Sequence, residues 1–374
     1  MNSDEQRGSR PEGGLRPRGG VICVGPDQDA LWDQSVRSSA QGGDFLQSKV
    51  LSALAENERP TARVVRLALV APGEPEAYLG GWAFLVRKRY GLLYNSSFPL
   101  FYCGPWFAPP LDQPTGSAAK QLDLLYQLGE AAKQYVDIID CEAHPSLPDP
   151  RGLLFAGYQV ACKTCHVWPP TSESAWKRLN KTKRNEANRA KRSHAFHWMP
   201  VSEESLLHFS ALHDHTLGKF SWHAPQAWRD ALARHTLAMA ALGLCRLFVA
   251  TPMNSDAPNA LVSVLLNHAH RTAFLWRVGV RSDETGLIPA LYASAADAVR
   301  DELGGDWQIN FGGSPRLSLS RYKDYLGADV VTHYGISRQR PGWPWLVWRG
   351  GYALKEWHQI RRAIRQGRRM RHGA

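Results

Sequence analysis

A strand that runs directly into a glycine-rich turn constrains this chain more than any other stretch. Residues 307–311 (WQINF) alternate between apolar and polar side chains, which predicts a strand with one buried face. Residues 312–315 (GGSP) must end it, because glycine reaches positive φ and proline cannot continue a ladder. Three cations follow: Arg316, Arg321 and Lys323. Such a turn can hold an anionic donor or a developing oxyanion, or it can be a solvated basic loop.

The charge of the chain is concentrated in two segments. The 374 residues carry a net charge of +11; residues 176–197 contribute +7 and residues 338–374 contribute +9, so the remainder is acidic. Basic segments of this density favour anionic partners: phosphate groups, RNA or an acidic membrane face. Because 44% of the residues are hydrophobic, the chain can bury a large core, and its length allows two domains.

The N-terminus and the cysteines indicate the compartment. Residues 1–20 are rich in Gly, Arg and Pro and lack the apolar segment of a secretory signal, so we expect a disordered tail. No run of about 18 apolar residues is present to span a bilayer. Six cysteines in a chain of this size do not indicate a disulfide framework. The expectation is a cytoplasmic protein with reduced thiols.

Strand and helix patterns follow one another in the same way in both halves. In the first half, strands are predicted over 63–70, 79–87, 90–94 and 136–140, and a helix over 121–134. In the second half, strands are predicted over 158–168, 246–250, 260–266, 272–278 and 307–311, and helices over 175–192, from 203, over 227–241 and over 286–303. We therefore predict an α/β (α+β) fold built from two copies of one layout, each a mixed, mainly antiparallel sheet flanked by helices. The predicted parts are a tail (1–20), a first domain (21–165), a second domain (166–337) and a Trp/Arg-rich tail (338–374).

Residues 162–166 read Cys-Lys-Thr-Cys-His, the C-x-x-C-H pattern of c-type haem attachment. Haem attachment requires export, and within a predicted strand the two sulfurs are poorly placed to flank a porphyrin. A zinc site needs a second pair of ligands, for which His213 and His215 are an unsupported choice. We interpret the motif as ordinary strand residues and predict no metal site.

Several common catalytic motifs are missing from the sequence. It has no G-x-G-x-x-G, Walker A, G-x-S-x-G or H-E-x-x-H pattern, which argues against the common nucleotide-dependent, hydrolase and metalloprotease classes. Residues 281–286 precede a predicted helix whose first N–H groups could receive a phosphate. Asp283 and Glu284 count against that reading, and a plain helix start is an equal alternative.

Three segments together resemble the FemAB-like acyltransferases of the GNAT superfamily. They are residues 42–54 (GGDFLQSKVLSAL), 175–192 (AWKRLNKTKRNEANRAKR) and 309–329 (INFGGSPRLSLSRYKDYLGAD). In that family a basic helix with a K-x-x-R-N core follows a strand, and an aromatic-Gly turn leads to an aromatic-Lys pair. The matching residues here are Lys181, Arg184 and Asn185, then Phe311-Gly312 and Tyr322-Lys323. The likeness covers roughly residues 20–335.

The resemblance implies two GNAT-like domains and transfer of an acyl or aminoacyl group to an amine, in a setting such as cell-envelope or polysaccharide biosynthesis. The implied co-substrate is acyl-CoA or aminoacyl-tRNA, with no tightly bound cofactor. Two departures matter. The chain lacks the long helical arm of many tRNA-dependent relatives, and Asn310 stands where the family commonly has Asp, which puts an acid/base role at residue 310 in doubt.

The turn and the resemblance together predict the site residues. Lys323 is the predicted catalytic residue, with an electrostatic role at the oxyanion, and the general base is unidentified. The residues predicted to bind donor or substrate are Lys181, Arg184, Asn185, Trp276, Arg277, Tyr292, Asn310, Gly312, Gly313, Ser314 and Arg321.

Two other classes of function stay open. A non-catalytic RNA-binding protein would use both basic segments, but RNA readers interleave stacking aromatics with cations, and the basic helix has only Trp176. A membrane-surface accessory protein would use the tail, where clustered tryptophans and then arginines predict contact of residues 343–369 with an anionic inner membrane face. Docking of those tryptophans on the second domain is the alternative. No DNA partner is expected.

Overall fold

The computed structural model describes residues 20–58, 62–89, 91–95, 101–113, 118–219, 224–281, 284–314 and 316–340. The first half contains β1 (Val21–Cys23), α1 (Asp29–Ser38), α2 (Ser48–Asn57), β2 (Arg63–Ala71), β3 (Glu74–Arg89), β4 (Leu92–Asn95), β5 (Trp106–Phe107), α3 (Ala118–Ala132), β6 (Ile138–Glu142) and α4 (Arg151–Phe155). The second half contains β7 (Gln159–Trp168), α5 (Lys181–Ser193), β8 (His194–Met199), α6 (Glu203–Gly218), α7 (Gln226–Ala241), β9 (Cys245–Pro252), β10 (Ala260–Asn267), β11 (Thr272–Val280), α8 (Leu287–Leu303), β12 (Gln308–Gly313), α9 (Leu317–Tyr325) and β13 (Asp329–Gln339). The predicted tails at 1–19 and 341–374, including the segment expected to contact membrane, lie outside the described residues.

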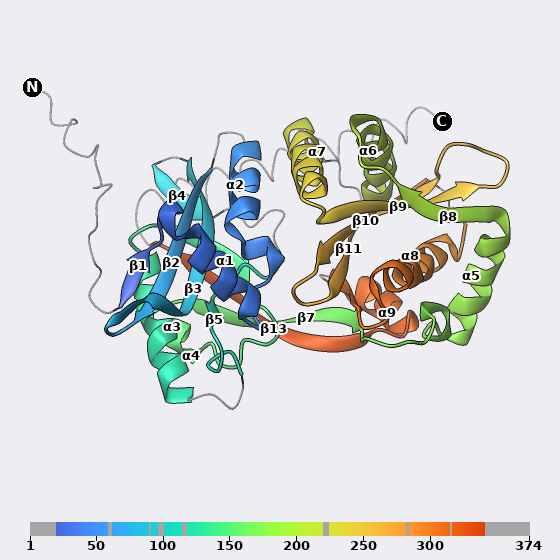
Figure 1. Ribbon diagram of the computed structural model, residues 1–374. Helices are drawn as coiled ribbons and strands as arrows, with labels where there is room; N and C mark the ends of the chain where they lie inside the picture. Colours follow the sequence, from blue (N-terminus) through green and yellow to red (C-terminus); the bar gives the residue numbers. More distant parts are fainter. Residues whose placement is uncertain are drawn as a thin grey trace, which may run out of the picture.

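The strands of the described residues form one 13-stranded sheet, in the order β1-β2-β3-β4-β6-β13-β7-β12-β11-β10-β9-β8, with β5 beside β3 (Figure 1). Each half is an antiparallel meander followed by one parallel step, β4 to β6 in the first half and β11 to β12 in the second. Helix α3 connects the first parallel pair through the chain, and α8 connects the second. The predicted mixed α/β class and the repeated layout are confirmed.

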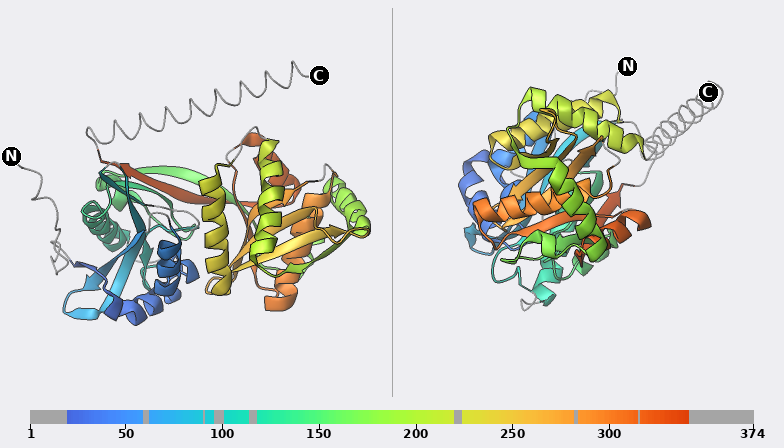
Figure 2. Two further views of the ribbon diagram at one scale, coloured as in Figure 1. Left: turned by 90° about the horizontal axis from the view of Figure 1, so that it is seen from above. Right: turned by 90° about the vertical axis from the view of Figure 1, so that its right-hand side faces the viewer.

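The two halves meet through the long antiparallel pair β7 and β13 (Figure 2). β13 is the last strand of the described chain, yet it also pairs with β6 of the first half, from Gly335↔Glu142 to Gln339↔Ile138. β7 runs across the predicted boundary at residue 165, and β13 across the one at residue 337. The division into two domains therefore stays a prediction, because the hydrogen-bonded sheet is continuous.

Helices cover both faces of the second-half sheet. α6 and α7 lie on one face against β11 and β9, and α8 lies on the other against β10 (Figure 1). The helix predicted over 286–303 is confirmed as α8, and its Leu291, Ala295 and Val299 are buried on one face. No helix in the described part of the chain has both the length and the hydropathy to cross a bilayer.

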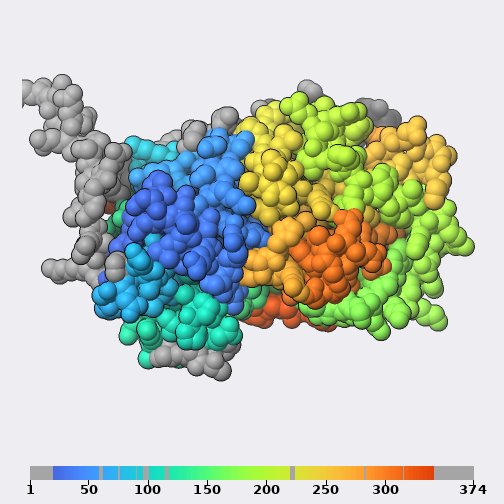
Figure 3. Space-filling view, in the orientation of Figure 1, coloured from blue at the N-terminus to red at the C-terminus, as the bar shows by residue number. Residues whose placement is uncertain are grey.

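The halves also dock through residues 42–45 (Gly-Gly-Asp-Phe) and through α2. The blue atoms of the α2 region lie against the yellow atoms of the α7 region in Figure 3. Gly43 has φ +98°, and the backbone N–H of Asp44 donates to Oδ1 of Asn267 at the end of β10 (3.3 Å). The carboxylate of Asp44 accepts from the backbone N–H of Ala269 (3.0 Å), and α2 packs against α7. Phe274 of the second half is part of the first-half core, so the two cores share side chains.

The basic helix predicted over 175–192 is in fact two pieces. A 3-10 turn covers Ala175–Lys177, and α5 starts only at Lys181. Asn180 caps α5, since its side chain accepts from the backbone N–H of Lys183 (2.8 Å). An asparagine at an N-cap satisfies a backbone N–H that a helix start leaves without a partner. The sequence prediction counted Asn180 as helix interior and therefore missed this break.

Gly286 provides a test of how α5 and α8 pack. It has φ +100°, and a Cβ there would lie 2.3 Å from the backbone of Glu186 on α5. Gly286→Ala should lower the free energy of unfolding by about 2 kcal/mol or more, since it adds a clash to the cost of positive φ. The matched control is Gly73→Ala, which has φ +80° but no atom within 4 Å of the added Cβ. Urea denaturation that gave the two variants equal losses would contradict the packing described here.

Candidate active site

The second half contains a fork where β11 and β12 stop pairing. The parallel pairs are Thr272↔Gln308, Ala273↔Ile309 and Phe274↔Asn310. Beyond them, the ring of Tyr292 from α8 lies 5.5 Å from that of Phe311 on β12. Phe101 of the first half stacks on Phe274 (4.6 Å between ring centroids) and meets Trp276 edge-on (6.5 Å). Aromatic rings thus lie beside the fork on both faces of the sheet, and one of them comes from the other half.

Lys323 of α9 holds the glycine turn that ends β12. Its Nζ donates to the carbonyl oxygens of Phe311 (2.8 Å), Gly312 (2.9 Å) and Gly313 (2.7 Å). An ammonium has three N–H donors, so all three are used here. The side chain is buried, and burial lowers the pKa of Lys323 to about 8, while the neighbouring Cys165 opposes that shift. Lys323, the predicted catalytic residue, therefore lies at the turn. Its ammonium fixes the turn by donating one hydrogen bond to each of three carbonyl oxygens.

Asn310 fixes the same turn from the opposite face of β12. Its Oδ1 accepts from the backbone N–H of Gly312 (2.7 Å), and its Nδ2 donates to the hydroxyl oxygen of Tyr102 (3.0 Å). Gly312 has φ +68°, a conformation that glycine adopts without steric cost. An ionised aspartate at 310 could accept from Gly312 but could not donate to Tyr102. The amide therefore suits a positioning role.

Tyr102 lies over a buried thiol at the junction of the halves. Its hydroxyl donates to Sγ of Cys165 (3.2 Å), and its φ of +52° is rare for a residue with a side chain. Burial first, and then the neighbouring Cys165, raise the pKa of Tyr102 well above its ordinary value. The hydroxyl is therefore a proton donor at neutral pH, and it links the first half to β7 and β12.

An ionic cluster closes the junction beside Tyr102. Nε2 of His333 on β13 lies 3.1 Å from Oε2 of Glu142 on β6, and Nζ of Lys163 on β7 donates to Oε1 (2.9 Å). Burial lowers the pKa of His333, but the neighbouring Cys165 and the Glu142 carboxylate outweigh it, and the pKa is raised to about 9. The hydrogen bond from His333 lowers the pKa of Glu142 to about 2 against the effect of burial, and Lys163 adds to that lowering. His333 is therefore a cation at neutral pH.

The equivalent fork in the first half is filled by the chain itself. β4 and β6 pair in parallel only at Tyr94↔Ile138. The segment that follows enters the space: the backbone N–H of Gly104 donates to the carbonyl of Glu142 (3.1 Å), and β5 pairs with β3. A Cβ on Gly104 would lie 2.7 Å from Cα of Ala143, so the packing is close. Among the described residues, no third backbone segment bonds into the β11–β12 fork in this way.

Three more of the predicted site residues lie after β12, on α9 and at the α6–α7 face. Ser314 follows β12 directly, with Oγ 3.4 Å from Nδ1 of His166, and Arg321 is exposed on α9. Arg277 points to the α6–α7 face, where its guanidinium lies over the rings of Trp276 (5.4 Å) and Trp228 (5.5 Å). Burial lowers the pKa of Arg277.

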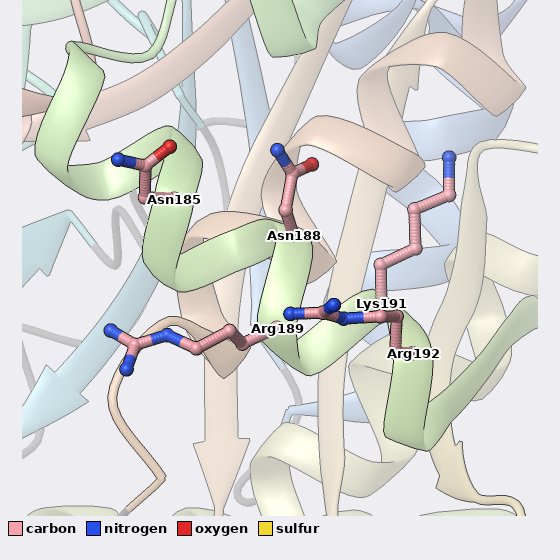
Figure 4. Close-up of a pocket in the computed structure, with 5 residues that line it drawn as sticks. All are labelled: Asn185, Asn188, Arg189, Lys191 and Arg192. Carbon is pink, nitrogen blue, oxygen red and sulfur yellow. The ribbon is translucent and has the colours of Figure 1, made fainter.

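The predicted residues on α5 lie apart from the fork. The guanidinium of Arg184 donates to the carbonyls of Lys177 (2.5 Å) and Leu179 (2.8 Å), so it shapes the turn before α5. Lys181 and Asn185 are exposed. Figure 4 shows Asn185 on a shallow surface groove along α5. The groove is lined by Asn185, Asn188, Arg189, Lys191 and Arg192.

The C-x-x-C-H motif lies on β7, as predicted. Cys162 is exposed and Cys165 is buried, because residues three apart on a strand point to opposite faces. In the part of the chain that the structure describes, no group of three or more His, Cys, Asp or Glu side chains is arranged to hold a metal ion.

Sequence reasoning missed Tyr102, Cys165, Glu142 and His333. Of these four residues, only Cys165 belongs to a recognisable sequence pattern. It is the second cysteine of the C-x-x-C-H motif, which we interpreted as ordinary strand residues. The others meet because β13 inserts between β6 and β7, and no local pattern reports that pairing.

No protein-family model and no curated protein sequence matches this chain. Solved structures match its fold. A crystal structure of FemX is 13% identical and covers 84% of this chain and 96% of its own, with a TM-score of 0.59. The chain has the fold of FemX and of tandem GNAT proteins. A tandem GNAT protein from the clavulanic acid biosynthesis pathway is 11% identical over 86% of this chain and 99% of its own (TM-score 0.55). A conserved protein of unknown function from Bacteroides thetaiotaomicron is 11% identical over 85% and 98% (TM-score 0.52).

These similarities confirm the expected FemAB-like resemblance at the level of the fold. They agree with the two parallel steps described above, one in each half. At identities this low they establish the arrangement of the backbone.

The His333–Glu142 pair predicts a pH dependence of stability. His333 has a folded-state pKa of about 9, above its ordinary 6.5, so its contribution is complete below pH 6.5 and is lost as the pH rises through 9. Glu142→Gln should lower the pKa of His333 in an NMR titration. It should also reduce the loss of unfolding free energy between pH 6.5 and 9.5, measured in urea.

The control is Glu130→Gln, which removes a carboxylate of α3 that is paired with Lys133, the residue after that helix. It should leave the His333 titration unchanged. An unchanged His333 pKa in the Glu142 variant would contradict the assignment of the pair.

Proposed function

We propose that this protein is an acyltransferase that moves an acyl or aminoacyl group from an activated donor to an amine. The observation that carries the proposal is the β11–β12 fork, bordered by aromatic rings and ending in a glycine turn that Lys323 fixes. The likeness in fold to a tandem GNAT protein supports it. The donor is acyl-CoA or aminoacyl-tRNA, and no resident cofactor is part of the proposal.

The site is assigned to the second half alone. In the first half, residues 103–107 occupy the place where β4 and β6 diverge. A donor there would have to displace Trp106 and Phe107, which are buried. The aromatic rings beside the second fork instead suit the apolar chain of a thioester donor or the terminal base of an RNA-linked one.

Amide formation needs a neutral amine and stabilisation of an oxyanion. Lys323 supplies the electrostatic part by holding three carbonyl oxygens toward its ammonium. Because a peptide unit is planar and trans, the N–H groups of Gly313 and Ser314 then point away from Lys323. The Gly313↔Cys165 pair uses one of these two N–H groups in the ladder with β7. We assign the other N–H group to the acyl oxygen, and Lys323 to keeping it in that direction.

The surface of α5 favours a second candidate, an RNA-binding protein. Its groove presents three cations and two amides without a carboxylate (Figure 4). Trp176, under the Nζ of Lys191 (4.8 Å), adds one aromatic face. The same surface would contact the polyanionic part of an RNA-linked donor.

Cytoplasmic placement with peripheral attachment to an anionic membrane through residues 343–369 belongs to the proposal as well.

The first experiment is mass spectrometry of the purified protein for copurifying CoA species and tRNA. A bound CoA thioester or aminoacyl-tRNA supports the transferase and identifies the donor. Bulk RNA without an aminoacyl group, together with no transfer to a panel of primary amines, would favour the RNA-binding candidate instead.

Lys323→Met should lower transfer by about 100-fold or more, which is the scale of a lost oxyanion stabiliser. Its circular dichroism should stay that of a folded protein. The control is Lys49→Met, which removes an exposed lysine on α2, outside the fork. Wild-type turnover by the folded Lys323 variant would remove Lys323 from the mechanism.

A further inference from the structure

Strand β8 forms one edge of the 13-stranded sheet and runs from α5 to α6 (Figure 1). Over all six of its residues, from His194 to Met199, it pairs with β9 alone. Among the described residues, the backbone of residues 195–199 makes no hydrogen bond outside that ladder. An open edge of this kind is a template for another strand.

The register of β8 decides which of its backbone groups are open. The N–H of Met253 donates to the carbonyl of Ser193 (2.9 Å), so these two residues continue the β8–β9 register as a hydrogen-bonded pair. Hydrogen-bonded pairs alternate along an antiparallel ladder, so residues 195, 197 and 199 also bond to β9. The N–H and C=O groups of residues 194, 196 and 198 therefore point away from β9.

The sequence of β8 lacks the features that commonly keep an edge strand from pairing. Such strands are often very short, charged, bulged or broken by proline. β8 reads HAFHWM, without Lys, Arg, Asp, Glu or Pro, and its register with β9 has no bulge. Phe196 and Trp198 are half-buried on the α8 face, and Ala195 and His197 are exposed on the other face. The opposite edge of the sheet, β1, has only three residues.

The two ends of β8 have opposite charge on the α8 face. α5 packs against α8 and carries the exposed Lys191 and Arg192 next to the start of β8 (Figure 4). At the other end of β8, the exposed Asp301 and Glu302 lie in the last turn of α8. Glu302 lines the same groove as Pro200, which follows β8.

Each end also has one ion of the opposite sign. Glu284 lies 3.8 Å from Nδ1 of His194 at the start of β8, and Arg246 is paired with Glu302 at its end. Among these groups, the start keeps an excess of cations and the end an excess of anions. A second copy that runs antiparallel would bring the cationic start of each strand to the anionic end of the other. A foreign peptide would need charges of its own to match, whereas this chain already has them.

We propose that β8 pairs in antiparallel orientation with β8 of a second copy, so that one sheet continues through a twofold dimer. An overlap of all six residues would set His194 opposite Met199, whose backbone groups already bond to β9. The register centred on Phe196 instead pairs all three outward-facing residues, 196 with 196 and 194 with 198. It places Ala195 of each copy opposite His197 of the other, on the exposed face.

Sedimentation velocity of the full-length protein over a series of concentrations tests the dimer, and a monomer–dimer equilibrium is expected. Ala195→Lys/His197→Lys sets like charges opposite each other at two places across the twofold axis. It should weaken dimerisation by about 100-fold or more. The matched control, Ala195→Glu/His197→Lys, sets opposite charges at the same two places and should keep Kd within about tenfold of the wild type. Both positions are exposed, and circular dichroism confirms that each variant is folded.

Three results would overturn the proposal. A wild type that is monomeric at every concentration would leave the edge open for an extended peptide of another protein. A dimer that neither double substitution weakens would have its interface elsewhere on the molecule. Equal weakening by both double substitutions would contradict the pairing of residue 195 with residue 197. Transfer activity plays no part in these measurements, so the dimer and the proposed function can fail separately.

Discussion

Three hydrogen bonds from one ammonium hold together the part of the molecule on which its proposed chemistry depends. Carbonyls at 311, 312 and 313 converge on Nζ of Lys323, which ties the end of β12 to α9. Three carbonyls pointing the same way would repel one another without a cation between them. Lys323 can carry this charge in a buried place because all three of its protons are bonded. The turn, the direction of its N–H groups and the position of Ser314 all follow from that contact.

The other constraint is the exchange of strands between the halves. β13 leaves the second half, pairs with β7 and reaches β6 of the first half. It brings His333 to Glu142 beneath Tyr102, whose hydroxyl reaches Cys165 and Asn310. The fork and the junction are thus built from neighbouring parts of the same strands. Asn310 and Cys165 face the first half, while His166 faces α9. A movement of one half relative to the other would therefore change the geometry of the turn.

Local features of this site could be predicted from the sequence, and non-local ones could not. The strand over 307–311 was predicted because alternation is a local signal. The break predicted at Gly312 was wrong, because β12 continues to Gly313 past a register shift between Asn310 and Gly313. The nine-residue helix α9 was missed, since its length and its serines give no clear helical pattern. His166 was quoted in the C-x-x-C-H motif, but its partners lie 148 and 154 or more residues away in the chain. Only the pairing of β7 with β12 and β13 brings them together, and a single sequence carries no record of that register.

The reactive end of the donor is proposed to lie in the β11–β12 fork, and photo-crosslinking tests that location most directly. The probe is an N-acetylcysteamine thioester whose acyl chain carries a diazirine, which represents the reactive end of a thioester donor. After irradiation, we expect crosslinks to residues 275–280 of β11 and to residues 311–314 at the end of β12. Crosslinks confined to residues 92–95, 103–107 and 138–142, around the filled fork of the first half, would contradict it.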